Sequence, residues 1–302
     1  LKLALQYQAN RGSDRSIVVP LENAYHGDTF GAMSVSGRGT FTDPFSSLLF
    51  DVRRLPDPSE GDAVAAFDAL IDREGHAIAA IIVEPLLLGA GGMRMYDEAT
   101  LAALRSRARD GGILFIADEV LTGFGRTGPL FACERAGIAP DIMCLSKGIT
   151  GGSLPLGATV ATEEIFQAFL SEDRHRTLFH GHSYTANPIA CAAGRASLAL
   201  LNGESAQKRD AINSAHRAGI ARFDSHPLVV NPRILGTIAA FDLDIGSGYL
   251  SPIGREMADH ALCSDILLRP LGNVVYVLPP FCATPADLER VYGVIEQFLA
   301  AH

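Results

Sequence analysis

The stretch Ile113-Leu114-Phe115-Ile116-Ala117-Asp118-Glu119-Val120 decides the fold. Five consecutive apolar residues run directly into Asp118, a pattern typical of a strand that is buried on both faces of a sheet. The run Asp141-Ile142-Met143-Cys144-Leu145 repeats this design and is closely followed by Lys147. Because open α/β sheets bind ligands at the carboxyl ends of their strands, we expect Asp118 and Lys147 to open into one crevice.

A carboxylate and an amine at one sheet edge suit pyridoxal phosphate. The amine of Lys147 would form a Schiff base with the cofactor, and Asp118 would keep the pyridine nitrogen protonated so that the ring withdraws electrons. The simpler alternative is that Asp118 caps a helix or a loop and that Lys147, which precedes a glycine, is solvated. The pair alone does not decide between these interpretations.

The composition is that of an ordinary globular protein, with 48% hydrophobic and 20% charged residues in a chain of 302. A formal net charge of -9 without a Lys/Arg-rich run argues against nucleic acid or an anionic membrane as the main partner, so we expect a small-molecule substrate. The five cysteines form no C-x-x-C pair, which favours reduced thiols in the cytoplasm. The first residues read as the inside of a helix without a cap, so we expect further residues upstream of Leu1.

Buried strands alternate with helical segments through the first two thirds of the chain. Strand patterns at 16–21, 78–83 and 113–118 are separated by helical patterns at 62–74 and 97–109. This alternation predicts an α/β fold with a mainly parallel sheet flanked by helices. Asn187-Pro188 then opens a long helix that leads out of a large domain, residues 1–203.

The remaining residues, 204–302, predict a smaller α+β domain. We expect a helix to Phe223, strands near 229 and at 238–243, a helix at 252–263, strands at 266–269 and 274–278, and a last helix capped by Thr284-Pro285. No internal repeat or low-complexity linker interrupts the chain.

Two further motifs have competing interpretations. The glycines of Thr122-Gly123-Phe124-Gly125-Arg126-Thr127-Gly128 suggest a phosphate loop, but the segment lacks the Gly-Lys-Ser/Thr end of a P-loop and the dinucleotide spacing. His175, His180 and His182 have no carboxylate or cysteine at a familiar ligand spacing, so no metal site is predicted.

Taken together, several motifs resemble those of the class III pyridoxal-phosphate aminotransferases over essentially the whole chain. They are Tyr25-His26-Gly27-Asp28-Thr29, Glu84-Pro85, Asp118-Glu119-Val120, Gly123 to Gly128, and Ser146-Lys147-Gly148. The resemblance implies the fold type I of pyridoxal-phosphate-dependent transferases, and a homodimer with shared active sites.

The resemblance also implies roles for individual residues. Lys147 would be the Schiff-base lysine and Asp118 the partner of the pyridine nitrogen, while Val120 and Tyr25 would lie against the cofactor ring. Glu84 would support the site by hydrogen bonding, and Arg269 would bind the substrate carboxylate. The loop Gly181-His182-Ser183 would bind the cofactor phosphate of the neighbouring subunit. Tyr25 and Gly181 would also line the substrate site. The fork of an arginine is well suited to a carboxylate.

Within the class, the stretches 27–36, 89–96, 268–270 and 275–280 look most like the members of biotin synthesis. This implies transfer of an amino group to 8-amino-7-oxononanoate to give 7,8-diaminononanoate, with S-adenosylmethionine or lysine as the donor. The alternatives are an ω-amino acid:pyruvate transaminase, an aminomutase of the same fold, and a binding protein or impaired fragment that keeps the fold without the chemistry.

Overall fold

The computed structural model describes residues 1–245, 248 and 250–302 and divides into two compact units. Unit 1 comprises Leu1–Gly123 and Ala132–Leu198, and unit 2 comprises Phe124–Phe131 and Ala199–His302. The chain passes from the first to the second inside helix α7 (Pro188–Leu200). The domain division after residue 203 stays a prediction.

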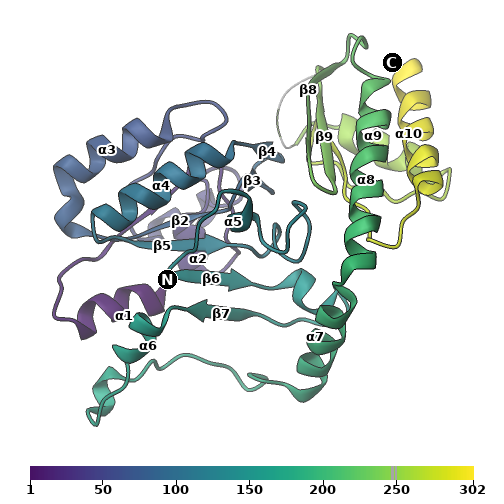
Figure 1. Cartoon of the computed structure of the whole chain (residues 1–302). Helices are drawn as coiled ribbons and strands as arrows, with labels where there is room; N and C mark the ends of the chain where they lie inside the picture. Colours follow the sequence, from purple (N-terminus) through teal and green to yellow (C-terminus); the bar gives the residue numbers. More distant parts are fainter. Residues whose placement is uncertain (246–247, 249) are drawn as a thin grey trace. The chain divides into compact units, whose positions relative to one another are not determined.

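Unit 1 is built on a five-stranded sheet in the order β1-β2-β5-β6-β7 (Figure 1). Its strands are β1 (Ile17–Pro20), β2 (Ile78–Val83), β5 (Leu114–Asp118), β6 (Ile142–Leu145) and β7 (Ala158–Ala161). The first four are parallel, whereas β7 runs antiparallel to β6. The predicted mainly parallel sheet is confirmed, and its register pairs Asp118 with Cys144.

Helices surround this sheet. They include α1 (Lys2–Asn10), α2 (Phe30–Val35), α3 (Ala63–Glu74), α4 (Glu98–Asp110), α5 (Ala132–Arg135) and α6 (Glu163–Gln167), with the short 3-10 helices η1 (Asp43–Leu48), η2 (Gly75–Ala77), η3 (Lys147–Thr150) and η4 (Arg174–Arg176). A small hairpin pairs β3 (Leu87–Leu88) with β4 (Arg94–Met95).

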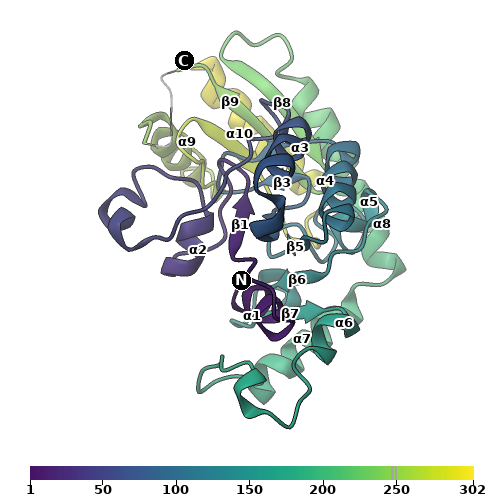
Figure 2. The ribbon, with the colours of Figure 1, turned by 90° about the vertical axis from the view of Figure 1, so that its left-hand side faces the viewer.

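The two faces of the sheet are covered by different helices, with α3 and α4 on one side and α1 on the other (Figures 1 and 2). Leu114 and Ile116 of β5 pack with Tyr7 of α1 in one hydrophobic cluster. Phe115 points the other way, where the guanidinium of Arg105 on α4 lies 5.8 Å from its ring centroid. Because successive side chains of a strand alternate between faces, burial on both sides requires the unbroken apolar run that the sequence has here.

Unit 2 has an antiparallel sheet in the order β10-β9-β8. Its elements are β8 (Val229–Leu235), β9 (Ile238–Leu243), β10 (Val274–Val277), α8 (Gly203–Ala221), α9 (Ile253–Leu262) and α10 (Pro285–Ala300). The predicted start of the last helix is confirmed: Asp287 N–H donates to Thr284 Oγ1 at 3.2 Å, and Thr284 N–H donates to the Asp287 carboxylate at 2.8 Å. This capping box satisfies amide groups that no helical carbonyl can reach.

The strand predicted at residues 266–269 is wrong, because this segment forms no strand. A reciprocal pair of backbone hydrogen bonds joins Leu271 to Val274 directly before β10. Pro270 precedes that turn and has no N–H to donate, so the pairing with β10 does not extend further back along the chain.

His216 of α8 lies fully buried in the core of unit 2. Its Nε2 is 3.0 Å from the carbonyl oxygen of Thr237, which can only accept, so Nε2 carries the hydrogen. Its Nδ1 therefore accepts from the hydroxyl of Tyr292 at 2.7 Å. Burial lowers the pKa of His216 from 6.5 to about 4, and the histidine is neutral in the folded protein.

We expect the stability of unit 2 to fall as the pH drops from 6.5 to about 4. In this window the unfolded chain binds a proton at this position and the folded chain does not, so acidification favours unfolding; below pH 4 both states are protonated and the loss stops growing. The predicted loss is about 3 kcal/mol, since each unit of pKa difference corresponds to about 1.4 kcal/mol. Denaturant titrations should show this slope in the wild type and in His226→Gln but not in His216→Gln; an equal slope in all three would contradict the assignment.

Among the described residues, the helices are all too short or too polar to cross a membrane.

Candidate active site

The carboxyl ends of β5 and β6 carry the two residues that the sequence singles out. Asp118 is the last residue of β5 and is only 8% exposed. Lys147 begins η3, three positions after the Cys144 that pairs with Asp118, and its side chain is exposed. Because the two strands are adjacent and parallel, both residues stand at the same edge of the sheet, as predicted.

The backbone at Lys147 is unusual, with a φ of 42°. This left-handed conformation costs energy for a residue with a side chain, and such strain gathers at functional positions. The surrounding turn supports it: Gly152 N–H donates to the Lys147 carbonyl at 3.2 Å, and the hydroxyl of the preceding Ser146 donates to the Leu156 carbonyl at 2.7 Å. The lysine is therefore held in place by its main chain while its amine remains accessible.

Asp118 contacts His26, a residue for which the sequence predicted no role. His26 Nδ1 lies 2.7 Å from Asp118 Oδ2, and the imidazole is only 3% exposed. Asp118 Oδ1 accepts from Val120 N–H at 3.1 Å. The only hint of this contact was the position of His26 between Tyr25 and Gly27 after β1, because no local pattern links residues 92 positions apart.

The other ring nitrogen of His26 is an unsatisfied polar atom. Nε2 is buried and has no hydrogen-bond partner within the described ranges. Burying a polar atom without a partner costs about 1–3 kcal/mol, so this atom marks a place where the isolated chain is incomplete.

Glu84 ties two loops of the site together. Its carboxylate, only 5% exposed, accepts from Tyr25 N–H at 2.8 Å and from Gly89 N–H at 3.1 Å. Burial raises the pKa of Glu84 to about 7, while the nearby His26 acts in the opposite direction. The two loops also touch directly, since a Cβ on Gly91 would lie 2.1 Å from the Asn23 carbonyl oxygen. Glu84 thereby fixes the main chain at Tyr25, whose side chain is 39% exposed.

The loop predicted to bind the partner subunit's cofactor phosphate is also in unit 1. Its residues Gly181, His182 and Ser183 are exposed and follow η4. The hydrogen bonds of His182 run to its neighbours: its N–H donates to Thr185 Oγ1 at 3.1 Å, and its Nδ1 accepts from Tyr184 N–H at 3.1 Å. These bonds do not join the loop to Asp118 or Lys147.

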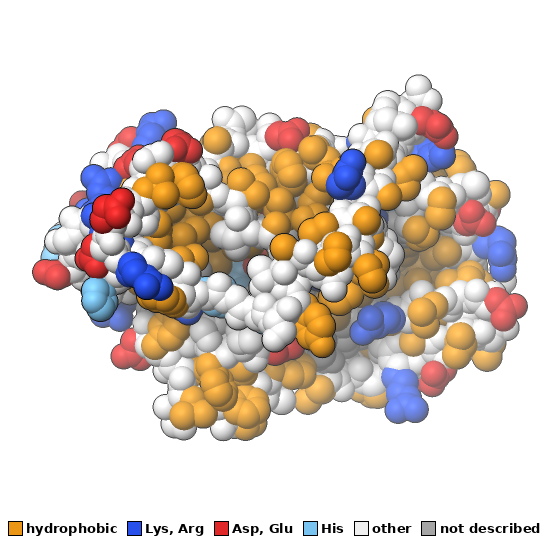
Figure 3. Space-filling view, turned by 90° about the horizontal axis from the view of Figure 1, so that it is seen from below, with side chains coloured by type: hydrophobic (Ala, Val, Ile, Leu, Met, Phe, Trp, Pro, Cys, Tyr) orange, Lys and Arg blue, Asp and Glu red, His pale blue; other side chains and the backbone are white. Residues whose placement is uncertain are grey.

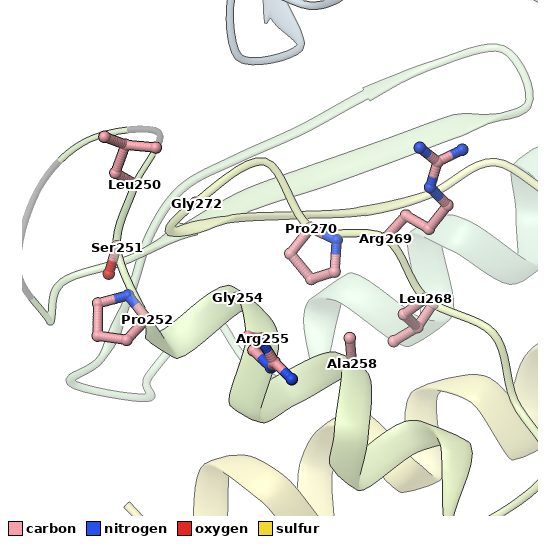
Figure 4. Close-up of a pocket in the computed structure, with 10 residues that line it drawn as sticks. All are labelled: Leu250, Ser251, Pro252, Gly254, Arg255, Ala258, Leu268, Arg269, Pro270 and Gly272. Carbon is pink, nitrogen blue, oxygen red and sulfur yellow. The ribbon is translucent and has the colours of Figure 1, made fainter.

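Arg269 belongs to unit 2, whereas the other candidate residues are in unit 1. It lines a hollow of about 450 Å³ beside α9, together with Arg255 and Pro270 (Figure 4). Its side chain points away from α9 in this view. A second hollow, of about 510 Å³, is also lined by Arg269 and contains Tyr276.

The chemistry of the strand-end group fits pyridoxal phosphate. A buried carboxylate can hold a proton on a pyridine nitrogen, and an accessible lysine can bond an aldehyde. The buried Nε2 of His26, which has no hydrogen-bond partner among the described residues, indicates a site that another group completes. Among the residues that the structure describes, no group of three or more His, Cys, Asp and Glu side chains is arranged to hold a metal ion.

Comparisons with known proteins agree with this chemistry. Residues 1–299 match the family Aminotransferase class-III. An adenosylmethionine-8-amino-7-oxononanoate aminotransferase of Synechococcus elongatus is 50% identical over 99% of this chain and 73% of its own length. One from Nitratidesulfovibrio vulgaris is 37% identical over 100% of this chain, which spans only 60% of that protein.

Solved structures show the same relationship. The adenosylmethionine-8-amino-7-oxononanoate aminotransferase of Methanocaldococcus jannaschii superposes with a TM-score of 0.94 at 31% identity, over 99% of this chain and 72% of that one. An amine transaminase from an uncultivated Pseudomonas species in the PLP-bound form has a TM-score of 0.89 at 30% identity, over 99% and 73% of the two chains. The family implies pyridoxal phosphate as the cofactor.

Proposed function

This chain belongs to the class III aminotransferases, and from that premise we propose that it transfers an amino group to 8-amino-7-oxononanoate, giving 7,8-diaminononanoate for biotin synthesis. The observation that carries the chemistry is the buried Asp118–His26 pair at the same sheet edge as Lys147. Support for the substrate comes from the relatives named for this reaction, one of them 50% identical.

The strand-end residues would hold the cofactor. We propose that Lys147 bonds it covalently, that Asp118 binds its pyridine nitrogen, and that Val120 and Tyr25 lie against its ring. Bound pyridoxal phosphate supplies an electron sink that stabilises negative charge on the substrate carbon. Buried Asp118 maintains that property by its negative charge, and His26 fixes the orientation of the carboxylate.

The chain itself supplies proton transfer and substrate orientation. The amine of Lys147 can take a proton from the substrate carbon and return one, because a positioned base beside the reacting atom contributes roughly 10²–10⁴-fold to the rate. We propose that Arg269 binds a substrate carboxylate, for which its guanidinium offers two parallel donors.

The proposal includes a homodimer in which the loop Gly181-His182-Ser183 binds the cofactor phosphate of the partner subunit. Figure 3, which is seen from below relative to Figure 1, shows hydrophobic side chains exposed to solvent on this face. Next to this loop in the sequence, Phe179 is 70% exposed and Tyr184 74% exposed, and a partner subunit would bury such aromatic side chains. We propose a cytoplasmic location, since the five cysteines are all free thiols.

The imidazole of His26 gives a first test of the site. Replacing His26 with alanine should weaken cofactor binding roughly 10–100-fold, because a hydrogen bond to a charged group contributes about 1.5–3 kcal/mol. His26→Asn, whose side-chain amide can still donate to Asp118, should lose much less. Cofactor dissociation constants measured by absorbance would check this, and equal binding by wild type and His26→Ala would contradict the role.

The choice of substrate needs an assay of the intact protein. We expect 7,8-diaminononanoate to form from 8-amino-7-oxononanoate with S-adenosylmethionine or lysine as the donor, and little turnover of β-alanine with pyruvate. The second candidate is an ω-transaminase, favoured by solved ω-transaminase structures at 26–28% identity. Faster turnover of β-alanine and pyruvate would select it, while absence of both reactions would leave a protein that keeps the fold without the chemistry.

A further inference from the structure

Helix α1 presents a row of hydrogen-bond donors at four-residue spacing. Lys2, Gln6 and Asn10 share one face of the helix, since residues i and i+4 are neighbours on its surface. All three donate to the main chain of a distant segment, and we call them the α1 polar stripe. Tyr7 of α1 and Arg11, the residue that caps the end of α1, make a different contact: both bind Glu164 of α6 at 2.6 Å.

The acceptors are backbone carbonyls in and directly after η4. Lys2 Nζ donates to the Phe179 carbonyl at 2.8 Å, and Gln6 Nε2 donates to the Thr177 carbonyl at 2.9 Å and the Arg176 carbonyl at 3.3 Å. Asn10 Nδ2 donates to the Arg176 carbonyl at 3.1 Å. Along residues 176–179, which lie outside regular secondary structure after Arg176, these side chains therefore bind carbonyls that no helix or sheet partner reaches.

The contact is reciprocal at one end of the stripe. Arg176 donates from Nη2 to the Asn10 carbonyl at 2.9 Å and to the Ala168 carbonyl at 3.0 Å, and Asn10 Nδ2 also reaches Ala168 at 3.2 Å. Both α1 and the segment at residues 176–179 thus donate and accept hydrogen bonds across this contact. These bonds hold residues 176–179 in one position relative to α1.

After these fastened residues the chain is exposed and forms a turn through hydrogen bonds among its own residues. Residues 179–186 are all exposed. Thr185 donates to the His182 carbonyl both from its N–H, at 3.1 Å, and from its hydroxyl, at 2.8 Å. The turn therefore keeps its local shape, but its position relative to the sheet depends on the fastened residues 176–179.

We propose that the α1 polar stripe is a positioning device for the partner's active site. By fastening residues 176–179, it sets where the loop Gly181-His182-Ser183 projects from unit 1. This inference rests on the proposed function, in which that loop binds the cofactor phosphate of the partner subunit. Lys2, Gln6 and Asn10 accordingly act on the active site around the partner subunit's Lys147 and not on the one around the Lys147 of their own chain.

The test compares a change within α1 with a change at its C-cap residue, Arg11, in the intact protein. Gln6→Ala/Asn10→Ala removes neutral donors of the stripe, whereas Arg11→Ala removes the α1–α6 ion pair and serves as the control. In the cofactor-free protein, amide hydrogen exchange at residues 177–187 should become roughly tenfold faster in the double variant, as expected for the loss of neutral hydrogen bonds. The control should leave it unchanged. If the double variant does not fold, Gln6→Ala alone is measured in the same way, and unchanged exchange would overturn the proposal.

A mixed dimer tests the action across the interface. When the Gln6→Ala/Asn10→Ala chain pairs with a Lys147→Ala chain, the single remaining Lys147 receives its phosphate loop from a chain with an intact stripe. Borohydride reduction and mass spectrometry measure the fraction of Lys147 that carries cofactor after dilution. We expect retention at the wild-type level in the mixed dimer and roughly tenfold faster loss in the double-variant homodimer.

The outcomes separate this proposal from the function on which it rests. Fast cofactor loss that persists in the mixed dimer would show that the stripe acts on its own subunit, and would overturn the proposal. A wild-type protein without bound cofactor would refute the proposed function, and it would equally overturn the role at the partner's site; hydrogen exchange would still show whether the stripe holds the segment.

Discussion

Replacing Lys147 with alanine is expected to abolish amino transfer, lowering kcat by at least about 10⁴-fold. The variant loses both the covalent attachment of the cofactor and the base that moves the proton, since an alanine side chain can do neither. Single-turnover rates and the mass of the borohydride-reduced protein would measure the two losses separately.

Lys208→Ala is the matched control, because it removes the same charge from an exposed residue that pairs with Glu204 on the surface of α8. We expect wild-type rates from it. If Lys147→Ala kept its activity and its covalently bound cofactor, both the site and the proposed chemistry would have to be abandoned.

Replacing Asp118 with asparagine should lower kcat roughly 10³-fold, the size of effect seen when one preorganised electrostatic group is removed. Asparagine keeps the shape of the side chain but not its charge, so it cannot hold a proton on the pyridine nitrogen. It also leaves His26, which is 2.7 Å from the carboxylate, facing a neutral group in a buried position. The absorbance of the bound cofactor as a function of pH would report the change directly.

Asp141→Asn provides the comparison for this effect. Asp141 precedes β6, is partly buried and binds Arg105 at 2.8 Å. We expect this substitution to lower stability while leaving the cofactor spectrum unchanged. A spectrum altered equally by both substitutions would mean that Asp118 acts through the fold rather than on the cofactor.

Local patterns predicted the elements that bury apolar surface. The unbroken run before Asp118 and the similar run at 141–145 became adjacent parallel strands. The Thr284-Pro285 signal became the start of α10, with its capping box. Such patterns succeed because burial and capping depend on residues a few positions apart. The segment 266–269 was wrongly predicted to be a strand from the same kind of local pattern. Its apolar residues do not reveal that the pairing with β10 ends at Pro270.

The site was only partly visible in this way. The placement of Asp118 and Lys147 at one sheet edge could be predicted, because Asp118 ends β5, Lys147 closely follows β6, and parallel neighbours bring such positions to the same edge. The contact between His26 and Asp118 could not be predicted, because His26 lies in the loop after β1, Asp118 ends β5, and the two meet only when β1, β2 and β5 pack in order. The amides of Gln6 and Asn10 could not be matched to carbonyls about 170 residues away for the same reason.

The sequence by itself determined which segments enter the cores and which residue types stand at the strand ends, since hydrophobic periodicity is a local property of the chain. Only the tertiary structure decided the partner of each buried polar group: the imidazole beside Asp118, the two loops joined by Glu84, and the carbonyls bound by α1. A hydrogen bond requires two atoms within about 3 Å, and that proximity arises between residues distant in sequence only after the elements have packed.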